Sequence, residues 1–77
     1  MNKRIVAYVN EYCTNLIKDN EWLNLTFLEE ELVDHFKLEY DEDTDIHSNS
    51  SLGISEEDLF FKVFKHIQQK FGSLLDD

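Results

Sequence analysis

Apolar residues recur every three or four positions along the first 18 residues, and polar residues fill most of the positions between them. The apolar set comprises Ile5, Val9, Tyr12, Cys13, Leu16 and Ile17. This spacing places the apolar side chains on one side of an α-helix. We therefore predict an amphipathic helix over about residues 2–18, with Cys13 packed as a small core side chain.

A second helix is predicted over about residues 27–40. Thr26 and Glu29 have the Thr-x-x-Glu spacing of a capping box, which marks a helix start. Glu29–Glu31 would then lie in the first turn, where the helix dipole favours negative charge. The side that faces the core would comprise Leu28, Leu32, Val33, Phe36 and Tyr40.

The most regular apolar pattern predicts a third helix over about residues 56–71. Ser55 followed by Asp58 marks its start, and Gly72 is well placed to end it. Phe61 flanks the apolar face, and we expect it to be buried with that face. The face itself comprises Phe60, Val63, Phe64, Ile67 and Phe71.

Residues 41–54 lie between the second and third predicted helices and have no apolar period, with Ile46 as the one obvious anchor. Three amphipathic helices without a convincing sheet partner predict an all-α fold, a small three-helix bundle with a long acidic loop at 41–54. The alternative is a small α+β domain in which residues 5–9 and 23–27 are strands. In either case we expect residues 1–77 to form a single domain, because so short a chain buries one small core.

Charge is distributed unevenly along these elements. The chain has 17 Asp and Glu against 7 Lys and Arg, for a net charge of −10. Residues 29–58 alone carry −11, whereas residues 1–18 and 59–77 carry +2 and +1. This balance disfavours direct binding to nucleic acid or to an anionic membrane surface, and the apolar run at 5–9 is too short to span a bilayer. A basic protein surface is the partner that such a field attracts.

Residues with catalytic or metal-binding chemistry are few and scattered. Asp41, Asp43 and Asp45 alternate as in an EF-hand loop, but Ile46 stands where that loop needs glycine, and Leu52 where it needs glutamate. The three histidines lack a paired ligand spacing, and the isolated glycines form no phosphate loop. We therefore expect no metal site, no cofactor and no enzymatic activity. The single cysteine leaves no internal disulfide and favours a cytoplasmic location.

Residues 43–72 resemble acyl carrier protein-like domains. The similarity lies in Asp43-Thr-Asp-Ile, Leu52-Gly53-Ile54-Ser55, Asp58 and Phe71-Gly72. In that family a long loop leads to an Asp-Leu-Gly-x-Asp-Ser-Leu motif, whose serine carries phosphopantetheine, and the acidic helix after it binds basic patches of partner enzymes. Here the serine comes one position early. The resemblance implies a carrier-like domain, with or without phosphopantetheine at Ser55.

Three apolar residues near the second helix, Leu23, Phe27 and Leu38, would project away from its main stripe if the helix began early. Exposed apolar groups beside acidic ones are typical of protein-binding surfaces. If a partner buries these side chains, the chain is a subunit of a larger assembly.

The main hypothesis is a small non-enzymatic protein that presents carboxylates to a basic partner. An inhibitor, an immunity protein or a DNA mimic would act in this way, and the partner could be a nucleic-acid-binding protein. The carboxylates that we expect on this face are Glu29, Glu30, Glu31, Asp34, Asp41, Glu42, Asp43, Asp45, Glu56, Glu57 and Asp58.

Overall fold

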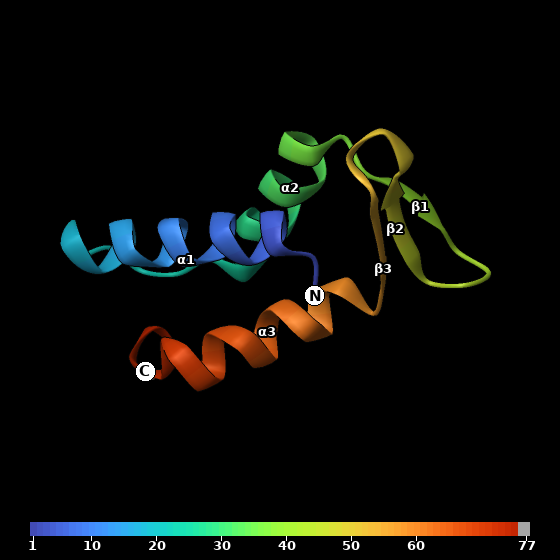
Figure 1. The fold of residues 1–77 in the computed structure, drawn as a ribbon. Helices are drawn as coiled ribbons and strands as arrows, with labels where there is room; N and C mark the ends of the chain where they lie inside the picture. Colours follow the sequence, from blue (N-terminus) through green and yellow to red (C-terminus); the bar gives the residue numbers. More distant parts are fainter. Residues whose placement is uncertain (76–77) are drawn as a thin grey trace.

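Three helices lie together on one side of the molecule, and a small antiparallel sheet projects from them (Figure 1). The computed structural model describes residues 1–75. Its elements in chain order are α1 (Lys3–Lys18), α2 (Leu25–Phe36), β1 (Glu39–Asp41), β2 (Ile46–Asn49), the short 3-10 helix η1 (Ser50–Leu52), β3 (Ile54–Glu57), α3 (Leu59–Lys70) and η2 (Gly72–Leu74).

The fold is therefore α+β, and the prediction of an all-α three-helix bundle is wrong. The alternative α+β prediction put its strands in the wrong places. Residues 5–9 lie inside α1, and residues 23–27 lead into α2. The strands instead occupy the segment predicted as an acidic loop and the two residue stretches next to it.

The first helix is confirmed almost to its predicted ends. The Asn2 side chain caps α1 by accepting a hydrogen bond from the backbone N–H of Arg4 at 2.8 Å. Ile5, Val9 and Cys13 are fully buried, as the apolar spacing predicts. The N-terminus of α1 lies next to the start of α3 in Figure 1.

The second helix begins earlier than predicted. Asn24, rather than Thr26, is its cap, and the Asn24 side chain accepts a hydrogen bond from the N–H of Phe27 at 3.0 Å. Asparagine is among the strongest capping residues, so the helix begins after Asn24 and not at the predicted capping box of Thr26 and Glu29. As a result the three glutamates lie beyond the first turn.

The second helix also ends earlier, because Lys37 adopts the left-handed conformation with φ of 50°. The N–H of Leu38 then donates to the carbonyl of Val33 at 3.0 Å, which closes a Schellman-type end. Leu38 is buried, and Tyr40, predicted as part of the helical core, is 52% exposed in β1. The Asn49 side chain donates to the carbonyl of Phe36 at 2.8 Å and so attaches this helix end to the sheet.

The sheet is a meander in the order β1-β2-β3. Tyr40 lies opposite His47, and His47 lies opposite Glu56. The His47 ring lies 4.5 Å from the Tyr40 ring and 4.8 Å from the Phe60 ring, centroid to centroid. His47 and Glu56 are both buried at 6% exposure, so polar residues fill inward positions where a strand pattern normally has apolar ones. The segment predicted as an acidic loop at 41–54 thus contains all of β2, one end each of β1 and β3, and the short helix η1.

The third helix begins at Leu59, not near residue 56. Asp58 precedes it in the left-handed conformation, and its side chain makes no capping hydrogen bond. Leu59, Val63 and Ile67 form the buried face. Phe61 is 63% exposed, so the expectation that it would be buried is wrong. The narrow stripe of Leu59, Val63 and Ile67 is enough to cover the small core, so Phe61 lies outside the buried face.

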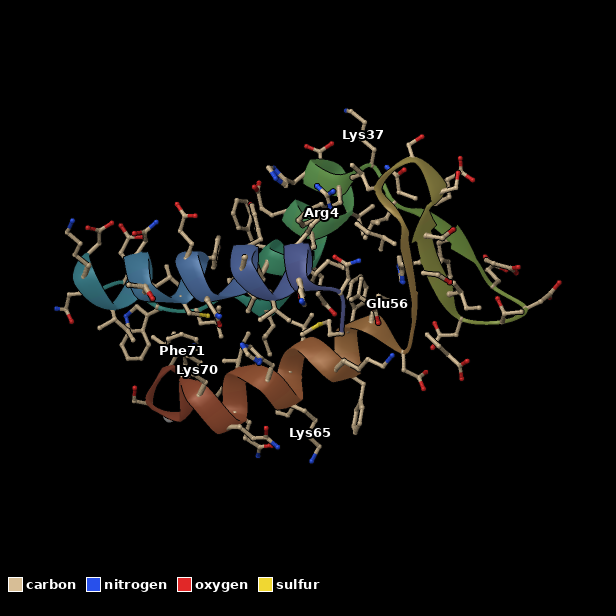
Figure 2. The ribbon with its side chains drawn as sticks, in the orientation of Figure 1. Arg4, Lys37, Glu56, Lys65, Lys70 and Phe71 are labelled. Atoms are coloured by element: carbon tan, nitrogen blue, oxygen red, sulfur yellow. The ribbon has the colours of Figure 1, made fainter. Side chains whose placement is uncertain are left out.

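Glu56 joins three parts of the chain that are far apart in sequence. Its carboxylate accepts a hydrogen bond from the backbone N–H of Asn2 and forms an ion pair with the ammonium of Lys62, N to O 3.2 Å. Figure 2 shows the Glu56 side chain between β3 and the first turns of α3. Within residues 1–75 this is the only ion pair. Glu56 therefore has a structural role in this chain.

Replacing Glu56 tests this role. We expect Glu56→Gln to lower the free energy of unfolding by about 1–3 kcal/mol, because the buried site loses a charge-assisted pair. The exposed neighbour provides the control, since Glu57→Gln should change stability by less than about 0.5 kcal/mol. Urea unfolding of both variants measures the difference, and equal stabilities would contradict the role.

His47 should make stability depend on pH. Burial lowers the pKa of His47 below its ordinary 6.5, and nearby Asp45 only partly opposes this shift. The unfolded chain then binds more protons than the folded one just below pH 6.5, so stability falls as the pH falls. Burial also lowers the pKa of His66, which adds to the trend. Urea unfolding at pH 7.5 and 5.5 should show a smaller pH effect in His47→Phe than in the wild type. An unchanged pH effect would contradict this assignment.

Candidate protein-binding surface

One side of α2 forms a shallow groove with the start of α3. Positions 26, 29, 30, 33 and 34 lie on one side of the helix because they are three or four residues apart, and Lys37 follows directly after the helix end. The groove has a volume of about 510 Å³. We call it the α2 groove, and its lining comprises Thr26, Glu29, Glu30, Val33, Asp34, Lys37 and Phe60.

The floor of the α2 groove is apolar. It consists of the half-buried side chains of Val33 and Phe60, one from each helix. The ring contact between Phe60 and His47 holds the Phe60 side chain against the sheet. The rings of Tyr40, His47 and Phe60 therefore pack in a row, and the last of them forms part of the groove floor.

Three acidic side chains, which we call the rim carboxylates, surround this floor: Glu29, Glu30 and Asp34. None of them has an ion-pair partner within the described part of the chain. Glu30 and Asp34 are exposed, whereas Glu29 is half-buried. Burial raises the pKa of Glu29, so its charged form is less stable there than in water. Lys37 is the cation at the end of the groove, and it extends away from the body in Figure 2.

The hairpin carries a second group of predicted acidic residues. Asp41, Glu42 and Asp43 are exposed at the turn between β1 and β2. Asp45 is more constrained, because its carboxylate accepts a hydrogen bond from the Tyr40 hydroxyl at 2.9 Å and its backbone carbonyl accepts one from the N–H of Asp58 at 3.2 Å, which brings the two carboxyl groups together. The Asp58 carboxyl group and the Tyr40 hydroxyl lower the pKa of Asp45, and the neighbouring Asp45 raises the pKa of Asp58. The turn thus presents both free and internally bonded carboxyl groups.

The eleven predicted carboxylates do not share one surface. Glu31 lies toward α1, where it accepts a 3.3 Å hydrogen bond from the Tyr8 hydroxyl. Glu57 is exposed on β3, whereas Glu56 points inward and is buried. Glu39, which the prediction omitted, is exposed on β1. It belongs to the segment of charge −11 at residues 29–58, which we call the acidic block. The acidic residues therefore form two main groups, at the α2 groove and on the hairpin, whereas Glu31, Glu56 and Glu57 belong to neither group.

Ser55, the predicted attachment residue, lies in the middle of β3. It is exposed and pairs with Ser48 across the sheet. The residue is therefore not at the start of a helix, because α3 begins four positions later.

The largest exposed apolar side chain is one that the sequence reasoning missed. Trp22 is 83% exposed and lines a second hollow with Ile17 and Leu23 at the end of α1. Of the three residues considered for a subunit contact, Leu38 is buried within the chain, Leu23 is half-buried and Phe27 is 50% exposed. The sequence feature that could have identified Trp22 as exposed is its position in a polar connection between two helices, outside any apolar stripe.

Other candidate chemical groups are not assembled into a site. Within residues 1–75, no three His, Cys, Asp or Glu side chains are placed to hold a metal ion. None of the helices in this range has both the length and the apolar character needed to cross a membrane. Cys13 is fully buried among core residues, and burial raises the pKa of its thiol to about 11. Such a thiol is a poor nucleophile.

Comparison with known proteins assigns no family. No protein-family model matches the chain, and no curated protein or solved structure gives a significant match. The α2 groove and the exposed carboxylates are therefore the features of the chain that bear on its function.

The burial of Cys13 predicts slow thiol labelling. At pH 8 a rise of the pKa from 9.0 to about 11 lowers the thiolate fraction about 100-fold, and burial slows access further. We expect Ellman's reagent to label the native protein at least about 100-fold more slowly than the protein in 8 M urea. Rapid labelling of the native protein would show that α1 opens easily or that the thiol is accessible.

Proposed function

We propose that this protein is a small non-enzymatic binding module that presents carboxylates to a basic surface of another protein. The observation that carries this proposal is the lack of internal compensation for the acidic block. Among residues 1–75 the only ion pair is Lys62–Glu56, so the exposed carboxylates of α2 and the hairpin have no cationic partner. Their mutual repulsion is a cost that a basic partner removes on binding.

The distribution of the cations supports the same proposal. Lys65 extends from α3 on the side away from α1, and Lys70 lies further along the same helix (Figure 2). Lys65 lies over the Phe61 ring and Lys70 over the Phe71 ring, at 5.6 and 5.7 Å from the centroids. These cations therefore interact with aromatic rings of α3. The exposed carboxylates of the acidic block therefore remain available for a basic partner protein.

This surface suits an inhibitor, an immunity protein or a DNA mimic. Glu30 and Asp34 are one helical turn apart, so their carboxylates follow each other along α2 at about 6 Å of axial rise. A row of negative charges on a rigid helix competes for a site that binds phosphates. A nucleic-acid-binding protein is therefore a suitable class of partner. A reducing compartment such as the cytoplasm suits the single buried thiol of this protein.

Two double variants of equal charge test this function. We expect Glu30→Gln with Asp34→Asn to weaken binding to a partner, captured from the host at low salt, by about tenfold or more. The control, Glu11→Gln with Glu21→Gln, removes the same charge outside the acidic block and should have an effect below about threefold.

Titration at two salt concentrations completes the test. The affinity of the wild type should fall as the salt concentration rises, because exposed charge pairs are screened within about 10 Å at 0.1 M salt. The Glu30→Gln, Asp34→Asn variant should lose part of that dependence. Affinity that ignores salt, or equal effects of the two double variants, would show that the acidic block does not carry the binding.

A further inference from the structure

We infer that the α2 groove binds a short basic amphipathic helix of the partner protein. In this arrangement an apolar side chain of that helix lies on the floor formed by Val33 and Phe60, and its lysines or arginines lie beside the rim carboxylates. The inference rests on the proposed function and adds the shape and chemistry of the partner. It also separates the α2 groove from the hairpin, whose exposed carboxylates Asp41, Glu42 and Asp43 do not line the groove.

The apolar floor of the groove is the first observation that favours this occupant. A purely electrostatic surface needs no apolar groove, yet Val33 and Phe60 leave apolar surface in a concave site between two helices. Such a site, buried at the centre and polar at the edge, is the arrangement that gives most of the binding energy in protein interfaces. Phe60 is already fixed by its contact with His47, so little side-chain entropy is lost when a partner covers it.

The shape of the groove indicates a helix. Its α2 wall runs from Thr26 to Lys37, a distance of about 16 Å at the helical rise of 1.5 Å per residue. An occupant helix of about three turns fits this length. Partner helices bind grooves of this kind through apolar side chains three or four positions apart.

The charge indicates a basic occupant. All three rim carboxylates lack an ion-pair partner within residues 1–75, and Glu29 is half-buried without compensation. A lysine or arginine beside Glu29 supplies that compensation where water is partly excluded and charge pairs are stronger. A second copy of this chain fits the groove less well, because two molecules of net charge −10 repel each other.

Designed peptides provide the probe. The test peptide has 14 residues of leucine and lysine, with leucines at positions i, i+3, i+4 and i+7 and a fluorescein label. The control peptide has the same composition with its leucines spread around the helix, so that its net charge is equal and its apolar stripe is lost. Fluorescence anisotropy at low and moderate salt measures the affinity of both peptides for the full chain. We expect the test peptide to bind at least about tenfold more tightly than the control.

Matched charge reversals locate the site. Glu30 is exposed in the α2 groove and Glu42 is exposed in the hairpin turn, so Glu30→Lys and Glu42→Lys change the net charge equally and leave the core intact. We expect Glu30→Lys to weaken binding of the test peptide at least tenfold and Glu42→Lys less than about threefold. Amide shifts caused by the peptide should map to α2 and Phe60, and circular dichroism checks that both variants fold.

The outcomes distinguish this inference from the function on which it rests. Equal binding of the two peptides, together with equal losses in the two variants, would overturn the groove and leave a diffuse acidic surface that binds basic proteins. No binding of either cationic peptide, or binding that does not depend on salt, would overturn both proposals. Shifts at the groove on raising the concentration of the protein alone would overturn the basic helix in favour of a second copy.

Discussion

The fold depends on one buried carboxylate. Glu56 accepts the N–H of Asn2 and pairs with Lys62, so it connects the start of α1, the last strand and the first turns of α3. Removing a charge from water has a large cost, and this cost is offset only where partners surround the group. Glu56 has those partners because three segments meet around it. Phe60, which lines the α2 groove, lies in the same first turn of α3 as Lys62.

The polar interior of the sheet links the fold to the candidate site. His47 lies between Tyr40 and Phe60, so an imidazole ring occupies a place where most small domains use an aliphatic side chain. Within the described part of the chain, Nδ1 of this ring has no hydrogen-bond partner. The His47 ring nevertheless packs against the Phe60 ring, which forms part of the floor of the groove. Through His47 the sheet thus supports Phe60, the residue that α3 contributes to the α2 groove.

The helices were largely predictable from sequence, and the sheet was not. Apolar spacing identified the buried residues of α1 because they lie on a regular stripe. On α3 it identified Val63 and Ile67, but it also placed the exposed Phe64 on the buried face and left out the buried Leu59. The strands escaped notice because His47 and Glu56 fill inward positions, and no apolar alternation remained to reveal them. The acidic block was visible as a count of charges. The α2 groove could not be predicted from the sequence, because Phe60 lies beside the exposed side of α2 only when α3 has packed against the rest of the chain.

The acidic composition also affects how this protein behaves among its own copies. The edge strand β1 is three residues long, all three residues are in exposed positions, and two of them are Glu39 and Asp41. An open strand edge normally invites another strand to pair with it and begin an aggregate. Here an approaching copy would bring the same negative charges to the edge, and repulsion would oppose the backbone pairing. Pairing between copies is therefore disfavoured at β1, and the sheet can remain small and open at that edge.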